Sequence, residues 1–188
     1  MVIEMENLPR LTKEDWLRAG FRALTTLGPS GVKAEPLARQ MNSTKGSFYW
    51  HFKDVAYFRE AMLAHWEQRA FTDVVTLLEG EPSIPKRLRL LGKIASNAAQ
   101  PEYGDGPIEP AIRAWSRSDS MVARAVARVD AQRLAYLSDL LAGIGLTNPD
   151  FSRIIYAGLI GLEDLSSRDT QDIQAPMGTL IDIVLTLE

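Results

Sequence analysis

The sequence predicts an all-α protein of about nine helices, with a small head at residues 1–53 and a larger helical body at residues 54–188. Apolar residues recur at spacings of three and four along most of the chain, as they do on the buried face of an α-helix. Alternating runs of β-branched residues, which predict β-strands, are absent. With 46% hydrophobic and 24% charged residues, the 188-residue chain can bury a core of its own.

Three short helices are predicted in the head, at residues 12–27, 34–41 and 45–51. Thr12 is expected to cap the first helix, which Gly28-Pro29-Ser30-Gly31 ends. Pro36 falls in the first turn of the second helix, where it is tolerated. Asn42 and Ser43 form a tight turn, and Thr44 caps the third helix. Two short helices separated by such a turn predict a helix-turn-helix.

The body is predicted to contain six further helices. They are expected at about residues 54–78, 85–99, 107–116, 120–142, 149–165 and 175–187. The first is long and follows the head directly. A loop rich in Gly and Pro at 97–107 and a polar connection at 166–174 separate later helices.

Charge is unevenly distributed along the chain. Residues 1–53 carry a net charge of +3, and the remainder carries −6. A basic head can therefore meet a polyanion that the acidic body repels. The absence of cysteine excludes disulfides and thiolate chemistry. Without a signal peptide or an apolar run of membrane-spanning length, the expected location is the cytoplasm, with no membrane partner.

The segment from Thr44 to Lys53 carries the clearest functional signal. Polar donors cluster at its start, where a recognition helix meets base edges and phosphates. Gly46 lets the backbone approach DNA closely, although glycine disfavours a helix by about 1 kcal/mol relative to alanine. Phe48 and Phe52, four residues apart, should pack inward. From composition alone, a merely structural aromatic helix is equally plausible.

Residues 12–66 resemble the DNA-binding domain of TetR-family transcriptional regulators. The resemblance rests on the run from Lys45 to Phe52 (Lys-Gly-Ser-Phe-Tyr-Trp-His-Phe), preceded at the family's spacing by Leu37-Ala38 and Gly31. The family usually has Gly and an aliphatic residue where Asn42 and Ser43 stand; Asn tolerates the left-handed turn conformation. Two further departures, at backbone-contacting positions, are Lys33 (often Thr) and Val55 (usually Lys).

The resemblance implies a bacterial one-component regulator, most simply a repressor. Its partners would be a double-stranded DNA operator, an unknown small-molecule effector and a second copy of the chain, since paired half-sites need a dimer. Tyr49 and His51 would contact phosphate, while Lys45, Ser47 and Trp50 would face base edges. The implied DNA-contacting residues are Lys33, Ala34, Thr44, Lys45, Gly46, Ser47, Tyr49, Trp50, His51 and Lys53.

In the body, the resemblance implies a ligand cavity and a dimer surface. Candidate cavity residues are the polar and aromatic groups His65, Trp66, Tyr103, Arg113, Trp115, Arg117 and Tyr136. Arg133 is expected to pair with Asp119 or Asp130, or to line the cavity. The last two helices would pair across a two-fold axis through Ile154, Ala157, Gly158, Gly161, Leu162, Leu165, Leu180, Ile181 and Val184. The alternative is that both stripes are buried within the monomer.

Two other function classes compete with a regulator. One is a helical ligand-binding protein whose head no longer binds DNA, which the departures at Lys33, Asn42 and Val55 would favour. The other is a helical enzyme. It is disfavoured because the sequence lacks a Gly-x-Ser-x-Gly elbow, a Walker loop, a dinucleotide fingerprint and a His-Glu-x-x-His motif. No cofactor, metal site or catalytic residue is expected.

Overall fold

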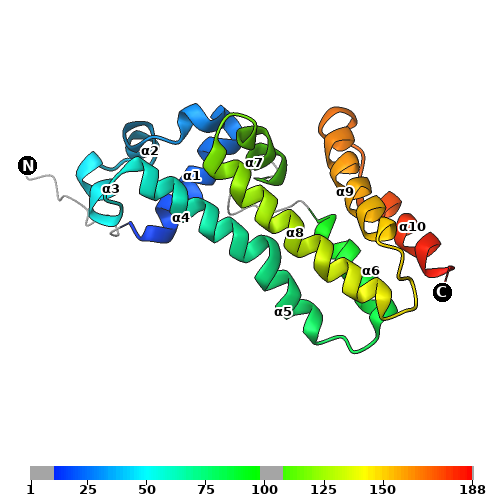
Figure 1. The fold of residues 1–188 in the computed structure, drawn as a ribbon. Coiled ribbons are helices and arrows are strands. Elements are labelled where there is room, and N and C mark those ends of the chain that lie inside the picture. Colours follow the sequence, from blue (N-terminus) through cyan, green and yellow to red (C-terminus); the bar gives the residue numbers. More distant parts are fainter. Residues whose placement is uncertain (1–10, 98–107, 188) are drawn as a thin grey trace, which may run out of the picture.

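The computed structural model describes residues 11–97 and 108–187, and within these residues every regular element is helical (Figure 1). The α-helices are α1 (Lys13–Leu27), α2 (Ala34–Gln40), α3 (Lys45–His51), α4 (Val55–Glu67), α5 (Asp73–Glu79), α6 (Ile84–Ala95), α7 (Ile108–Ser116), α8 (Ser120–Ala142), α9 (Asp150–Asp169) and α10 (Gln174–Leu185). A π-helical stretch at Gln68–Thr72 joins α4 to α5 in one rod. The predicted all-α fold of about nine helices is thus confirmed for the described residues.

The head forms as its capping signals predict. The Thr12 hydroxyl accepts a hydrogen bond from the Asp15 amide, and the Asp15 carboxylate accepts one from the Thr12 amide, so both ends of a capping box are present. Asn42 adopts the left-handed conformation, with φ of 47°, where the family usually places glycine. The helix-turn-helix geometry therefore survives that substitution. Leu27, the last residue of α1, is 62% exposed.

The long helix predicted at 54–78 is one rod with a change of helical winding in its middle. Asp54 caps α4 by accepting from the Tyr57 amide at 2.7 Å. Between Gln68 and Thr72 the backbone winds as a π-helix before α5 continues in the α form. In Figure 1 this rod runs from the head into the body beside α8. Insertions of this kind loosen the regular hydrogen-bond ladder and occur often at functional sites.

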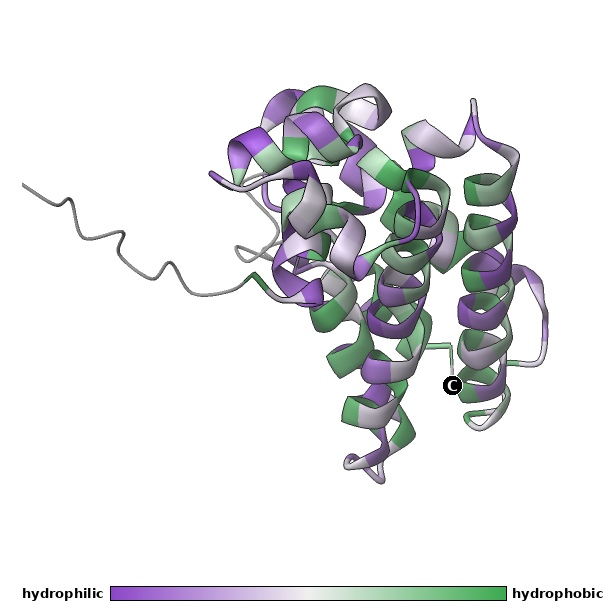
Figure 2. Cartoon of the chain, turned by 90° about the vertical axis from the view of Figure 1, so that its left-hand side faces the viewer, coloured by the Kyte–Doolittle hydropathy of each residue, from purple (hydrophilic) through white to green (hydrophobic). Residues whose placement is uncertain are grey.

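Two apolar cores hold the molecule together. The first joins the head to α4, α7 and the first half of α8, with Trp16, Phe48, Phe58, Ile112 and Val122 fully buried. The second joins α6, the end of α8, α9 and α10. Figure 2 shows apolar and polar residues alternating along the helices, as expected where each helix buries one face. The first core crosses residue 53, so the head is packed directly onto the body.

Several helix ends in the body differ from prediction. The helix predicted to reach residue 99 ends at Ala95, where Ser96 turns its hydroxyl back onto the Gly92 carbonyl at 2.7 Å. The helix predicted to end at Leu165 continues to Asp169 and stops at Thr170, which is left-handed. Ser120–Ala142 is predicted correctly. No helix of the described residues is both long and apolar enough to cross a membrane.

Candidate DNA-binding surface and ligand cavity

Helix α3 presents its predicted contact residues on the outside of the head. Thr44 caps the helix by accepting from the Ser47 amide at 3.1 Å, which fixes the first turn. Tyr49 is 49% exposed and Trp50 is 70% exposed. Polar residues flank these two side chains, so the outer face of α3 offers both aromatic and hydrogen-bonding groups.

The inner face of α3 is fixed by an aromatic cluster. Phe48 and Phe52 are both fully buried, as predicted. The Phe48 ring centroid lies 5.4 Å from that of Trp16 and 5.1 Å from that of Phe58, both in edge-on geometry. Such pairs add about 0.5–1.5 kcal/mol each beyond burial. The cluster joins α1, α3 and α4, so it sets the direction in which α3 faces outward.

Lys45 is held by an ion pair at the start of α3. Its Nζ lies 2.7 Å from Glu35 Oε2 on α2, and both side chains are 57% exposed. The hydrogen bond between them raises the pKa of Lys45 and lowers the pKa of Glu35. Exposed pairs of this kind are worth little. Lys45 can therefore exchange Glu35 for a phosphate or a base edge at small cost.

Two of the implied contact residues are partly enclosed by the protein. The Ala34 side chain is only 5% exposed, so a DNA contact at this position would come from the main chain. His51 Nε2 lies 2.8 Å from the Leu11 carbonyl oxygen, so this nitrogen has an internal partner in the structure. The other implied residues, Lys33, Gly46 and Lys53, are exposed, and Lys53 Nζ lies 5.2 Å from the Tyr57 ring centroid.

The body encloses a cavity of about 190 Å³ between the α4–α5 rod and helices α6, α7, α8, α9 and α10. Most of its wall is apolar. Phe71, Leu91, Leu137 and Met177 are among the residues that contribute. The polar part of the wall includes His65, Trp66, Arg69, Asn97, Glu109, Arg133, Tyr136, Tyr156 and Glu163. An apolar chamber with a few convergent polar groups is the usual form of a small-molecule site.

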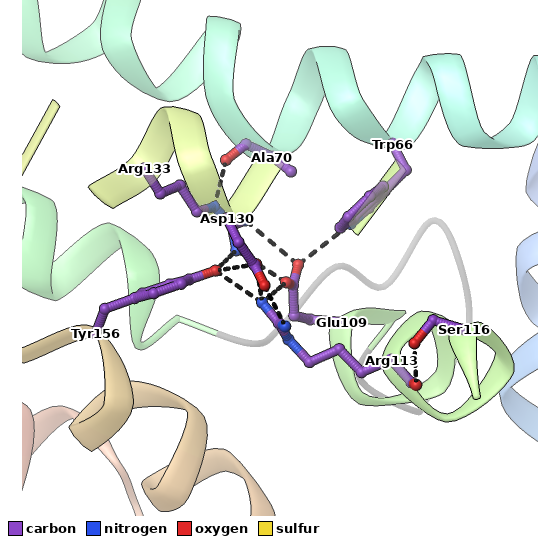
Figure 3. Close-up of polar contacts among 8 residues, drawn as sticks. All are labelled: Trp66, Ala70, Glu109, Arg113, Ser116, Asp130, Arg133 and Tyr156. Carbon is purple, nitrogen blue, oxygen red and sulfur yellow. Dashed lines mark hydrogen bonds and ion pairs between the residues drawn. The ribbon is translucent and has the colours of Figure 1, made fainter. Parts of the chain in front are cut away.

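A network of buried charges borders this cavity (Figure 3). Glu109 of α7 accepts from Arg133 Nη1 at 2.8 Å and from Arg113 Nη2 at 3.0 Å. Its other oxygen accepts from Trp66 Nε1 at 3.2 Å. Arg133 Nε also donates to the carbonyl of Ala70 in the π-helical stretch, at 3.1 Å. The network thus ties α7 and α8 to the rod that leaves the head.

The same network extends to α9 through Tyr156. Its hydroxyl donates to Asp130 Oδ1 at 2.7 Å and accepts from Arg113 Nη2 at 2.7 Å and from Arg133 Nη1 at 3.2 Å. Arg113 also donates to both oxygens of Asp130. Two arginines therefore face two carboxylates, and their charges balance. Burial raises the pKa of Tyr156 to about 12, so this phenol stays protonated.

Two further titratable groups of the wall, Glu163 and His65, are shifted toward neutrality. Burial raises the pKa of Glu163 to about 7, and the negative charge of Glu109 adds to the shift while Arg113 and Arg133 oppose it. Burial also lowers the pKa of His65. By contrast, burial opposes ionisation of Asp130, but hydrogen bonds from Arg113 and Tyr156 keep its pKa low. The pairing of Asp130 with Arg113 therefore keeps this carboxylate charged despite its burial.

Three of the seven predicted cavity residues, His65, Trp66 and Tyr136, line the cavity. Arg113 lies in the charge network but not on the wall. Trp115 is 2% exposed, with the Arg59 guanidinium 5.6 Å from its ring centroid, and Arg117 is exposed; neither lines the cavity. Tyr103 lies outside the described residues.

Sequence reasoning missed Glu109, Tyr156 and Glu163. Glu109 and Arg113 stand four residues apart, which was a usable signal for a helical ion pair. Tyr156 and Glu163 stand seven apart on α9, on the face opposite the one assigned to the dimer. Arg133 pairs with Glu109 and also lines the cavity, while Asp119 instead caps α8. Arg133 thus both forms an ion pair and lines the cavity, two roles that the sequence predicts as alternatives.

The predicted dimer surface divides into outward and inward residues. Ile154 and Leu165 of α9 are 56% and 53% exposed, and Ala157 and Gly161 between them are also exposed. Gly158, Leu162 and Leu180 are half-buried. Ile181 and Val184 are buried and line the cavity, so their assignment to the dimer surface was wrong. Ile183 on α10 and Leu187, just beyond the end of this helix, are the outward apolar residues there, at 57% and 53% exposure.

Comparison with known proteins finds solved structures that share this fold. No protein-family model and no curated protein sequence matches the chain. A Rhodococcus sp. protein assigned to the TetR family of transcriptional regulators is 21% identical, with a TM-score of 0.68 over 92% of this chain and 97% of that one. Reduced Escherichia coli NemR is 18% identical, with a TM-score of 0.73 over 92% and 95% of the two chains.

A third solved structure agrees with these two. SCO4454, a TetR-family transcriptional regulator from Streptomyces coelicolor, is 16% identical, with a TM-score of 0.73 over 93% of this chain and 88% of that one. The fold and site define a helix-turn-helix head on a helical body that contains a cavity. This is the fold of the TetR-family transcriptional regulators.

Proposed function

We propose that this protein is a TetR-type transcriptional regulator, acting as a repressor. A dimer would bind a pseudo-palindromic operator through α3, and a small molecule in the body cavity would release it. The observation that carries the proposal is the exposed pair Tyr49 and Trp50 beside Lys45, on a helix that buried Phe48 holds in place. The ligand would act by population shift, favouring a spacing of the two heads that no longer fits the operator.

Selection of random DNA duplexes by the purified protein tests the DNA-binding part. We expect an enriched inverted repeat whose affinity falls steeply with salt, because phosphate contacts release counterions. Lys45→Ala and Tyr49→Ala should each weaken binding at least tenfold. Lys45→Ala should also reduce the salt slope by about one per head. Lys86→Ala is the matched control, since Lys86 is an exposed lysine on α6, outside the head.

Failure to enrich any sequence at low salt, with the protein folded, would contradict this proposal. It would favour the alternative in which the chain binds a ligand but not DNA. A helical enzyme would instead be indicated by turnover of a small molecule. Neither alternative has a specific observation in its favour among the described residues.

The dimer part is tested at α9. Ile154, Ala157, Gly161 and Leu165 form an outward strip whose small residues allow close helix approach. Leu165→Glu should convert the dimer to a monomer in sedimentation equilibrium, because it places two like charges across a two-fold interface. Leu77→Glu, at an exposed leucine on α5, should leave the dimer intact. A dimer that survives Leu165→Glu would refute this surface.

A further inference from the structure

We infer that the cavity is built for an amphipathic organic cation, with its charged nitrogen against the Glu163 carboxylate and its apolar body among the aliphatic and aromatic side chains of the wall. This inference rests on the proposed role of the cavity as the effector site, and it names the chemical class of the effector.

The first support is that several polar groups of the wall already make hydrogen bonds within the protein. Glu109 accepts hydrogen bonds from two arginines and from Trp66. The Tyr156 hydroxyl makes three hydrogen bonds within the network. The Arg133 guanidinium donates to Glu109, Tyr156 and Ala70. A ligand therefore gains little from these groups unless it breaks bonds that exist in the free protein.

Glu163 and the Tyr136 hydroxyl differ from these groups because neither has a hydrogen-bond partner among the described residues. The Tyr136 hydroxyl is buried and has no hydrogen-bond partner, while its ring meets Phe71 edge-on at 6.3 Å. Glu163 lines the cavity and makes no hydrogen bond or ion pair with any residue that the structure describes. A buried polar group without a partner is costly, so the Tyr136 hydroxyl gains by acquiring a ligand atom. Glu163 is half-buried and can accept a ligand atom without losing a bond to the described residues.

The second support is electrostatic. The charges that face Glu163 are Glu109 and Arg113 on α7 and Arg133 on α8, and both arginines are already paired with carboxylates. Among the described residues, an anionic ligand at Glu163 would meet two carboxylates and no cation without a carboxylate partner. A cation would meet one carboxylate that has no counter-ion, and it would hold Glu163 in the ionised form.

His65, on another part of the wall, has a separate set of charged neighbours. Glu14, Arg18, Arg69 and Asp73 act on it, and none of these is among the groups that act on Glu163. A largely apolar wall with one carboxylate that makes no ion pair among the described residues suits a ligand with a single charged head.

A series of three octyl compounds tests the inference. Octylammonium, octan-1-ol and octanoate share one apolar tail and differ only in the charge of the head. Isothermal titration of the purified protein at pH 8 should give the tightest binding for octylammonium, weaker binding for octanol and the weakest for octanoate. Octylammonium that does not bind, or binds no better than octanol, overturns the inference.

Two variants locate the effect. Glu163→Gln should weaken octylammonium binding at least tenfold and leave octanol within about twofold, which also reports an intact cavity. Asp164→Asn is the matched control: it removes the neighbouring carboxylate, which is exposed on α9 and pairs with Arg168. It should leave all three affinities unchanged. An equal loss of octylammonium and octanol in Glu163→Gln would indicate damaged packing and overturn the assignment.

The pH dependence gives a readout that packing does not. Glu163 must lose its proton to pair with the ammonium, so octylammonium affinity should rise about tenfold between pH 6 and pH 8, given a pKa of about 7 in the free protein. Octanol affinity should stay constant over the same range. In Glu163→Gln the rise should disappear, and a rise that persists would contradict the role of Glu163.

These titrations contain no DNA, so the two proposals can fail separately. A protein that selects an operator but shows no preference for the cation retains its proposed function and loses this inference. A protein that prefers octylammonium but selects no DNA retains the inference as a description of its cavity and loses the regulator.

Discussion

Replacing Glu109 by glutamine should destabilise the protein far more than the nearly identical shape of the two side chains suggests. The Glu109 carboxylate lies between two buried arginines, with its side chain only 16% exposed and that of Arg133 23% exposed. Both of its oxygens accept from N–H donors. A glutamine amide keeps one accepting oxygen but turns an NH₂ group toward donors at the other. It therefore cannot satisfy both sides, whichever way it is oriented.

The magnitude follows from the partners that remain. Arg113 keeps Asp130 in Glu109→Gln, but Arg133 loses its only paired carboxylate among the described residues and keeps neutral acceptors on Ala70 and Tyr156. Breaking a buried pair in this way costs about 3–5 kcal/mol. Removal of the Glu109 charge also lets Glu163 ionise more readily, which returns some compensation. We expect a net loss of about 2–4 kcal/mol in the free energy of unfolding.

Urea denaturation followed by circular dichroism measures this loss, at a fixed protein concentration because a dimer would add a concentration dependence. Glu67→Gln is the matched control. Glu67 pairs with Arg128, whose side chain is 58% exposed, and surface pairs are worth about 0–1 kcal/mol. If the two variants lost stability equally, the charge balance of the buried network would not be what holds α7 against α8 and the rod.

Three further outcomes are expected. Because the pKa of Glu163 is raised from 4.5 to about 7 in the folded protein, its ionisation should lower the free energy of unfolding by up to about 3 kcal/mol as pH rises between these values. His65 has the opposite effect below pH 6.5, so urea titrations of the wild type and of Glu163→Gln are compared across this range, and their difference isolates Glu163. A difference that does not change with pH would contradict the prediction. Gly92→Ala would place a Cβ 2.2 Å from Ile181 Cδ1 and should cost about 1–3 kcal/mol, whereas Gly178→Ala, which meets nothing within 4 Å, should stabilise α10 by up to about 1 kcal/mol; equal thermal shifts would refute the close approach of α6 and α10. Glu35→Gln frees Lys45 from its partner and should strengthen operator binding several-fold with a steeper salt dependence, while unchanged affinity would show that Lys45 does not reach DNA.

The head was predictable because its signals are local. A threonine cap, a glycine stop, a left-handed turn at Asn42 and the i, i+4 pair Phe48 and Phe52 each act within a few residues. The structure confirms each of them. What local signals could not show was the internal use of His51, whose partner Leu11 lies 40 residues away.

The cavity was only partly predictable because its wall is assembled from distant residues. Trp66 meets Glu109 across 43 residues, and Arg113 meets Tyr156 across another 43. Helical periodicity shows which face of a helix is apolar but not which neighbour covers it. On α10, Ile181 and Val184 form an apolar stripe that suits either a dimer or a cavity, and only the packing of α6 and α8 around them distinguishes the two.

The buried network also explains how the cavity and the head belong to one mechanical unit. Glu109 holds the last turn of α4 through Trp66, and Arg133 holds the π-helical stretch through the Ala70 carbonyl (Figure 3). Helix α7, which carries Glu109, packs directly on α1 of the head. A ligand at Glu163 lies beside the groups that make these contacts. Any rearrangement of their hydrogen bonds would change the support of two elements that touch the head, which under the proposed function is the route from the ligand to the operator.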